Sequence, residues 1–149
     1  MFVSKKNSAH SFRRLPFCRH EASAQLRRCG LELILERARQ LALLAGDGAD
    51  PDDASTLGGC AADAPDLDAR RLGAALRTFY SSLFSSATPE FSELASPARR
   101  VDARKRVATI LADAHERVHQ LASDPRHGGY ADTDFLVHTP QQVRVLLDV

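Results

Sequence analysis

Residues 96–125 read SPARRVDARKRVATILADAHERVHQLASDP, and apolar side chains recur in this stretch at helical intervals. Steps of four, three, four and three residues form one apolar stripe: Val107, Leu111, Ala114, Val118 and Leu121. Ser96 is a favoured N-cap with proline at the first helical position, and Asp124-Pro125 is a stop signal. The pattern therefore predicts one helix over 97–122, about 39 Å long at 1.5 Å per residue.

The segment before this helix carries the largest group of apolar side chains. Pro65 and Asp66 open a second predicted helix, over 66–86. Six large side chains share one face of it: Leu72, Leu76, Phe79, Tyr80, Leu83 and Phe84, and Phe91 and Leu94 follow. We therefore expect this segment to supply much of the core.

A third helical pattern covers residues 22–44. Its apolar stripe consists of Leu26, Leu33, Leu41 and Leu44, with Ile34 and Leu35 beside it. Gly30 interrupts the pattern, and a glycine there can end a helix in the left-handed conformation. We therefore predict two helical pieces with a break near Cys29-Gly30.

The last helix is predicted from its capping signal. Thr139, Pro140 and Gln142 supply the cap, the first helical position and the third position. Val143, Leu146 and Leu147 face one side. A helix of ~9 residues is not stable alone in water, so we expect it to dock on the long helix.

The composition agrees with an all-α fold. The chain has 149 residues, about one domain's length, and contains 23 Ala and 19 Leu against 8 Val and 2 Ile. The net charge of +1 argues against a nucleic-acid binder, and no apolar run approaches the ~20 residues of a membrane span. Three cysteines at wide spacing exclude a disulfide scaffold and a paired-cysteine zinc module.

Charge is distributed in blocks. Residues 1–28 carry a net +6 and residues 45–70 a net −6. We interpret 1–24 as a basic, disordered leader, with an organellar transit peptide as the alternative, and 45–65 as an acidic Gly/Asp/Pro linker. The basic block suits an acidic partner or a membrane surface, unless it is only a solvated segment. The predicted organisation is thus a leader, a helical segment over 25–44, the linker, and a helical domain over 66–149, forming a small antiparallel bundle.

The first half of the long helix is strongly basic. Its bases are Arg99, Arg100, Arg104, Lys105 and Arg106. Positive charge is unfavourable near a helix N-terminus, where the helix dipole is also positive. Asp102 is the one acid among them, so we expect a further acidic group to lie nearby.

One motif has the form of a catalytic site. His115-Glu116-Arg117-Val118-His119 matches the H-E-x-x-H pattern, in which two histidines bind Zn²⁺ and the glutamate polarises its water. A catalytic zinc needs a third protein ligand, but Ala122 and Pro125 stand where the extended motif has glycine and histidine. The remaining candidates for a third ligand are His127, His138, Asp124, Asp132 and Asp134. We favour His115 and His119 as packing residues at a helix–helix contact, with a small zinc metalloprotease as the alternative.

Several motifs occur together in the order typical of one family. They are Arg28-Cys29-Gly30-Leu31, then FYSSLFSSATPEF over 79–91, and AHERVHQLASDPRHGGY over 114–130 followed by LVHTPQQVRVLL over 136–147. Together they resemble the C-terminal part of subunit six of the conserved oligomeric Golgi complex, over roughly 25–149 without the 45–65 linker. Family members tend to have tyrosine where this chain has His115 and His119, which suits the packing interpretation.

The resemblance implies a non-enzymatic function. It implies the C-terminal part of a helical-rod tethering subunit, at the cytoplasmic face of the Golgi membrane, acting in intra-Golgi, chiefly retrograde, vesicle transport. The implied partners are other subunits of the complex and SNARE proteins, with no cofactor and no nucleic acid. Whole subunits are longer and begin with a coiled-coil region, so the chain resembles a C-terminal fragment or a truncated product. A helical interaction domain of an unrelated pathway is a further alternative.

Overall fold

A computed structural model describes residues 15–44, 60–84, 96–126 and 128–149. The helices are α1 (Leu15–Cys29), α2 (Leu31–Leu44), α3 (Ala69–Phe84), α4 (Pro97–Ser123) and α5 (Pro140–Leu147), with a short 3-10 helix η2 (Ala61–Asp63). The described residues contain no strand. The predicted all-α class is therefore confirmed.

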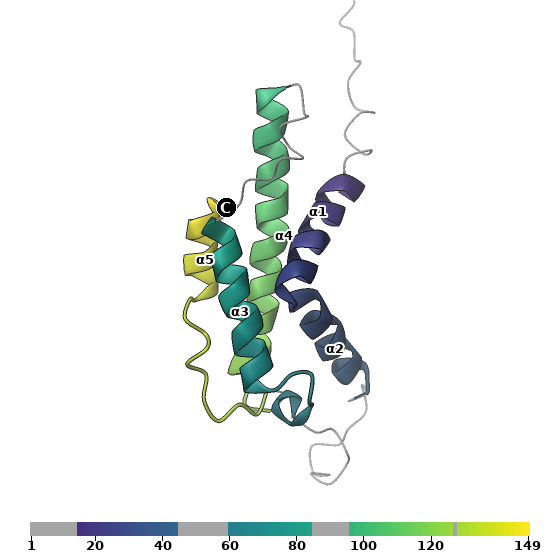
Figure 1. The fold of residues 1–149 in the computed structure, drawn as a ribbon, viewed down its shortest axis with the longest axis vertical. Coiled ribbons are helices and arrows are strands. Elements are labelled where there is room, and N and C mark those ends of the chain that lie inside the picture. Colours follow the sequence, from purple (N-terminus) through teal and green to yellow (C-terminus); the bar gives the residue numbers. More distant parts are fainter. Residues whose placement is uncertain (1–14, 45–59, 85–95, 127) are drawn as a thin grey trace, which may run out of the picture.

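The helices are arranged around α4, the longest of them (Figure 1). α1 and α2 pack beside α4 and also against α3, and α5 packs on α4, with α3, α4 and α5 alternating in direction along the chain. The predicted helix 97–122 is confirmed, because α4 spans Pro97–Ser123. Ser96 occupies the N-cap position, although its side chain makes no capping hydrogen bond.

The predicted apolar stripes of α3 and α4 form the core. Leu72, Leu76, Phe79 and Tyr80 are buried on α3, and Val107, Leu111, Ala114 and Val118 are buried on α4. Leu83 and Leu121 are partly buried at its edge. The Phe84 side chain, Phe91 and Leu94 lie outside what the structure describes.

Gly30 separates α1 from α2, as predicted. Its φ of +83° lies in the left-handed region, which a glycine adopts at low cost. The predicted stripe joining Leu26 to Leu33 is wrong, because Leu26 is buried and Leu33 is 69% exposed. The turn at Gly30 changes the direction of the chain, so α2 presents Leu31 and Ile34 to the core instead.

The helix before Gly30 starts earlier than the sequence suggested. Residues 15–24 were expected to belong to a disordered leader, but they form most of α1. Cys18 and Ala22 are buried at helical spacing, in line with Leu26 and Cys29. Small residues formed this part of the stripe, so the apolar pattern in the sequence was weak there. Residues 1–14 lie outside the described part.

The C-terminal end of the predicted linker also belongs to the fold. Ala61 is 2% exposed, and the Ala62 N–H donates to the Gly128 carbonyl oxygen at 2.9 Å. Gly129 packs on Cys60 so closely that an added Cβ would lie 2.5 Å from the Cys60 Cβ. Residues 60–65 are therefore fixed against the chain after α4, whereas 45–59 lie outside the described ranges.

Candidate functional site

The structure places the three residues of the zinc motif in separate contacts. His115 is fully buried, with Nε2 2.9 Å from the Tyr80 hydroxyl of α3. His119 is half-buried, and its Nδ1 lies 3.3 Å from the Ser123 hydroxyl. The Glu116 carboxylate accepts a hydrogen bond from Arg144 of α5 at 2.8 Å. The His115 and His119 rings lie near each other, with centroids 6.1 Å apart, but their hydrogen-bond partners differ.

The candidates for a third zinc ligand have neighbours of their own. The His138 ring meets the Tyr80 ring edge to face, with centroids 4.8 Å apart. The carboxylates of Asp124 and Asp132 accept hydrogen bonds from the backbone N–H groups of Arg126 and Asp134, at 2.8 Å each. His127 lies outside the described residues. Within those that are described, no three His, Cys, Asp or Glu side chains form a metal-binding group.

His115 is held as a neutral imidazole. Burial, together with the nearby His119 and His138, lowers the pKa of His115 to about 4, while Glu116 acts in the opposite direction. Its ring stacks on Phe79, with centroids 5.8 Å apart and an interplanar angle of 11°. His115 thus acts as a flat core residue with one hydrogen bond to α3.

The C-terminal helix docks on α4 through one buried side chain and one arginine. Val143 is fully buried, and Arg144 donates at 2.8 Å to both Asp113 and Glu116 of α4. These carboxylates raise the pKa of Arg144. The capping box is present in both directions, between Thr139 and Gln142. The predicted docking is confirmed, although Leu146 of the expected apolar face is 45% exposed.

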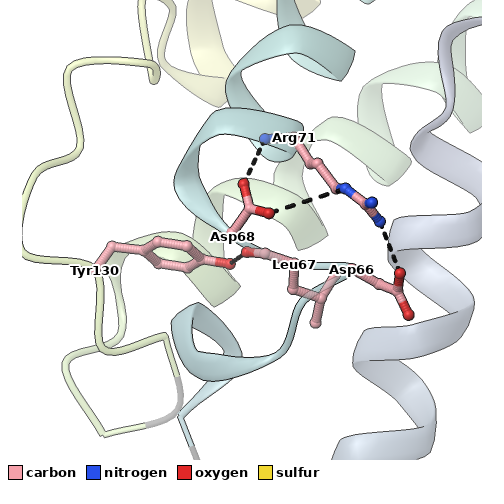
Figure 2. Close-up of polar contacts among 5 residues, drawn as sticks. All are labelled: Asp66, Leu67, Asp68, Arg71 and Tyr130. Carbon is pink, nitrogen blue, oxygen red and sulfur yellow. Dashed lines mark hydrogen bonds and ion pairs between the residues drawn. The ribbon is translucent and has the colours of Figure 1, made fainter.

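The chain between α4 and α5 is tied to the start of α3, as Figure 2 shows. The Tyr130 hydroxyl donates to the Leu67 carbonyl oxygen at 2.6 Å. Beside it, Asp68 accepts from the Arg71 backbone N–H at 2.8 Å, and the Arg71 guanidinium pairs with Asp66 at 2.8 Å. Burial, with a contribution from Asp68, raises the pKa of Tyr130 to about 12.

This tie was not predictable from the sequence alone. Tyr130 and Leu67 are 63 residues apart, and a backbone carbonyl acceptor has no sequence signal. The ion pairs of Arg144 were missed for a similar reason. Asp113 and Glu116 at i and i+3 do share a helix face, which was a usable signal for half of that site.

The surfaces left for partners carry exposed apolar side chains. One group lies at the C-terminal end: Val137, Val145, Leu146 and Val149. A second group, Leu33 and Leu43, lies on α2. Because the motif residues are occupied by internal contacts, these surfaces are better candidates for function than the histidines are. Among the described helices, none is long and apolar enough to cross a membrane.

Comparisons with known proteins agree on one family. A family model described as "Conserved Oligomeric Golgi complex subunit 6, C-terminal" matches residues 17–147. A protein of Arabidopsis thaliana named "Conserved oligomeric Golgi complex subunit 6" is 33% identical over 87 residues, which cover 56% of this chain and 13% of that protein. The chain thus matches a small part of this relative's length. No solved structure matches.

Proposed function

Because the chain belongs to the C-terminal family of conserved oligomeric Golgi complex subunit 6, we propose that it acts as a non-enzymatic helical component of that complex. The observation that supports this most strongly is the extent of the family match. It begins at residue 17 in α1 and ends at residue 147, the last residue of α5. The matched region therefore covers α2 to α5 completely and all of α1 except its first two residues.

We propose further that the chain works by binding alone. Its role would be vesicle tethering in intra-Golgi, chiefly retrograde, transport, at the cytoplasmic face of the Golgi membrane. Its partners would be other subunits of the complex and SNARE proteins. Two features support a binding function: the histidines of the zinc motif are occupied within the fold, and apolar side chains are exposed on α2 and around α5.

The experiment is capture of partners by the full 149-residue chain, expressed with an affinity tag in cells. We expect other subunits of the complex to co-purify with it, and SNARE proteins to be recovered with them. Recovery of neither class from cells in which the chain is folded would contradict the proposal. Stoichiometric zinc in the purified chain would instead favour the metalloprotease alternative.

Two double variants then locate the contact. Val145→Asp with Leu146→Asp places two charges on α5, where these side chains are 76% and 45% exposed. Leu33→Asp with Leu43→Asp does the same on α2, where they are 69% and 74% exposed. We expect one pair to lose subunit capture and the other to serve as its matched control. Unchanged capture by both pairs would exclude these two surfaces as the contact.

A further inference from the structure

The first three turns of α4 carry a concentration of positive charge. Residues 97–106 contain five bases and one acid, a net charge of +4. Asp102 pairs with Arg106 at 3.1 Å. The other four bases, Arg99, Arg100, Arg104 and Lys105, make no ion pair with any residue that the structure describes.

This charge distribution is unfavourable for an isolated helix. The N-terminal end of a helix is already positive, and the first turn of α4 contains no acidic residue. The further acidic group expected from the sequence is not found among the described residues. Glu90 and Glu93 precede the helix in the sequence and lie outside the described ranges. Within residues 15–44, 60–84, 96–126 and 128–149, these four bases therefore have no acidic partner.

These bases lie at one end of the group of described helices. The start of α4 extends beyond the ends of α1, α3 and α5 (Figure 1). α1 packs beside α4, and Cys18 of α1 is close enough to Arg106 for that charge to affect the pKa of its thiol. The neighbouring Arg19 is exposed and adds a base to this end.

Acidic side chains lie at the opposite end of α4. Asp63 and Asp66 are exposed, and they come just before α3 begins, where α4 ends. One of them, Asp66, is seen in Figure 2. Bases balance the acids at this end, because Asp66 pairs with Arg71, and Arg70 and Arg126 are exposed. The positive charge at the start of α4 is therefore what would orient the molecule in front of a charged surface.

We propose that the basic end, defined as Arg19, Arg99, Arg100, Arg104 and Lys105, binds the anionic headgroups of a phospholipid membrane. The inference rests on the proposed function for the identity of the membrane. A protruding end with several bases is suited to a flat anionic surface, where each base adds affinity without a shaped pocket.

The composition of this end favours a lipid surface over an acidic protein. Protein interfaces depend on a central group of apolar or aromatic anchors. Within the basic stretch of α4, Val101 is the one large apolar side chain that is exposed, at 53%. Charge attraction alone, by contrast, is sufficient for weak membrane binding.

The test is sedimentation of the full chain with vesicles of phosphatidylcholine, with and without phosphatidylserine. The variant Arg99→Gln/Arg104→Gln/Lys105→Gln removes three exposed bases from α4. The control Arg39→Gln/Arg70→Gln/Arg77→Gln removes three exposed bases from α2 and α3, so both variants have the same net charge. At roughly fivefold in affinity for each base, we expect the α4 variant to bind about 100-fold more weakly than the wild type, and the control to bind as the wild type does.

The outcomes separate the alternatives. Binding that requires phosphatidylserine, weakens with salt and is lost only in the α4 variant supports the proposal. Equal loss in both variants, or no binding by the wild type, overturns it. Capture of polyglutamate through the same bases without vesicle binding would overturn it in favour of an acidic protein. Vesicle binding is measured with the purified chain in the absence of other subunits, so failure of one proposal is distinguishable from failure of the other.

Discussion

His115 joins more of the core contacts described above than any other polar residue. It contacts Phe79 and Tyr80 of α3 and faces His119 and His138. Its Nδ1 is buried with no hydrogen-bond partner. A charged imidazole in this position would need to place a second N–H where the described residues offer no acceptor. The site therefore favours the neutral ring, so the stability of the folded state depends on pH.

Because His115 is buried as a neutral ring, we expect the folded state to lose stability in acid. The pKa of His115 is about 4 in the fold against 6.5 unfolded, so the unfolded chain binds the proton first as the pH falls. The contribution of the neutral imidazole to the unfolding free energy is fully present above pH ~6.5 and is lost as the pH falls towards ~4. This contribution is no more than about 3 kcal/mol. We expect His115→Phe to reduce this pH dependence of the unfolding free energy, measured by urea denaturation followed by circular dichroism.

The control for this prediction is Tyr80→Phe. It removes the 2.9 Å hydrogen bond but leaves the imidazole able to titrate, so the pH dependence should remain while stability falls by ~1 kcal/mol. An unchanged pH dependence in His115→Phe would show that other groups cause the acid loss.

A substitution at Gly129 tests the close contact between this residue and Cys60. The Gly129 φ of +65° disfavours any other residue, and a Cβ there would lie 2.8 Å from the Cys60 Sγ. We expect Gly129→Ala to lower the unfolding free energy by about 2–3 kcal/mol, from backbone strain and this clash. Adding Cys60→Gly removes the clash, so a double-mutant cycle should show recovery of part of the loss. Strict additivity would mean that the two residues do not meet.

α5 depends on α4 rather than on its own helix propensity. It has eight residues, too few for stability in water, and Val143 is its one buried side chain. The capping box and the ion pairs from Arg144 orient the helix, but the paired side chains of Arg144, Asp113 and Glu116 remain partly exposed, at 32%, 52% and 38%. Removal of apolar contact at Val143 should therefore release the helix.

Val143→Ala tests this dependence. We expect a cost of about 2 kcal/mol and faster hydrogen exchange of the α5 amides than of the α4 amides. Val145→Ala is the matched control, because the same change at a side chain that is 76% exposed should alter neither. Equal exchange in the two variants would contradict docking through Val143.

The molecule as a whole depends on α1 to cover α4. Cys18, Glu21 and Ala22 are buried, although they lie in the region that the sequence suggested was a leader. Removing residues 1–24 deletes this contact, whereas removing residues 1–14 leaves α1 intact. We expect the longer deletion to have the lower thermal midpoint, by roughly 3 °C for each 1 kcal/mol lost. Equal midpoints for the two deletions would show that α1 contributes little to the fold.

Local sequence signals determined the helices and most of their boundaries. Helical spacing identified the stripes of α3 and α4, Gly30 marked the break before α2, and Thr139 with Gln142 marked the start of α5. These signals are readable because helix formation and capping involve residues at most four positions apart. The family resemblance also came from motifs in the sequence, and the family match over 17–147 confirmed it.

Tertiary structure alone decided which neighbour each side chain meets. His115 and Glu116 are adjacent in the zinc motif, yet one contacts Tyr80 of α3 and the other Arg144 of α5. Packing also decided that Leu33 is exposed and that Cys18 is buried. Contacts between residues tens of positions apart depend on how the helices pack, because burial of one face is shared between elements and no local pattern specifies the partner.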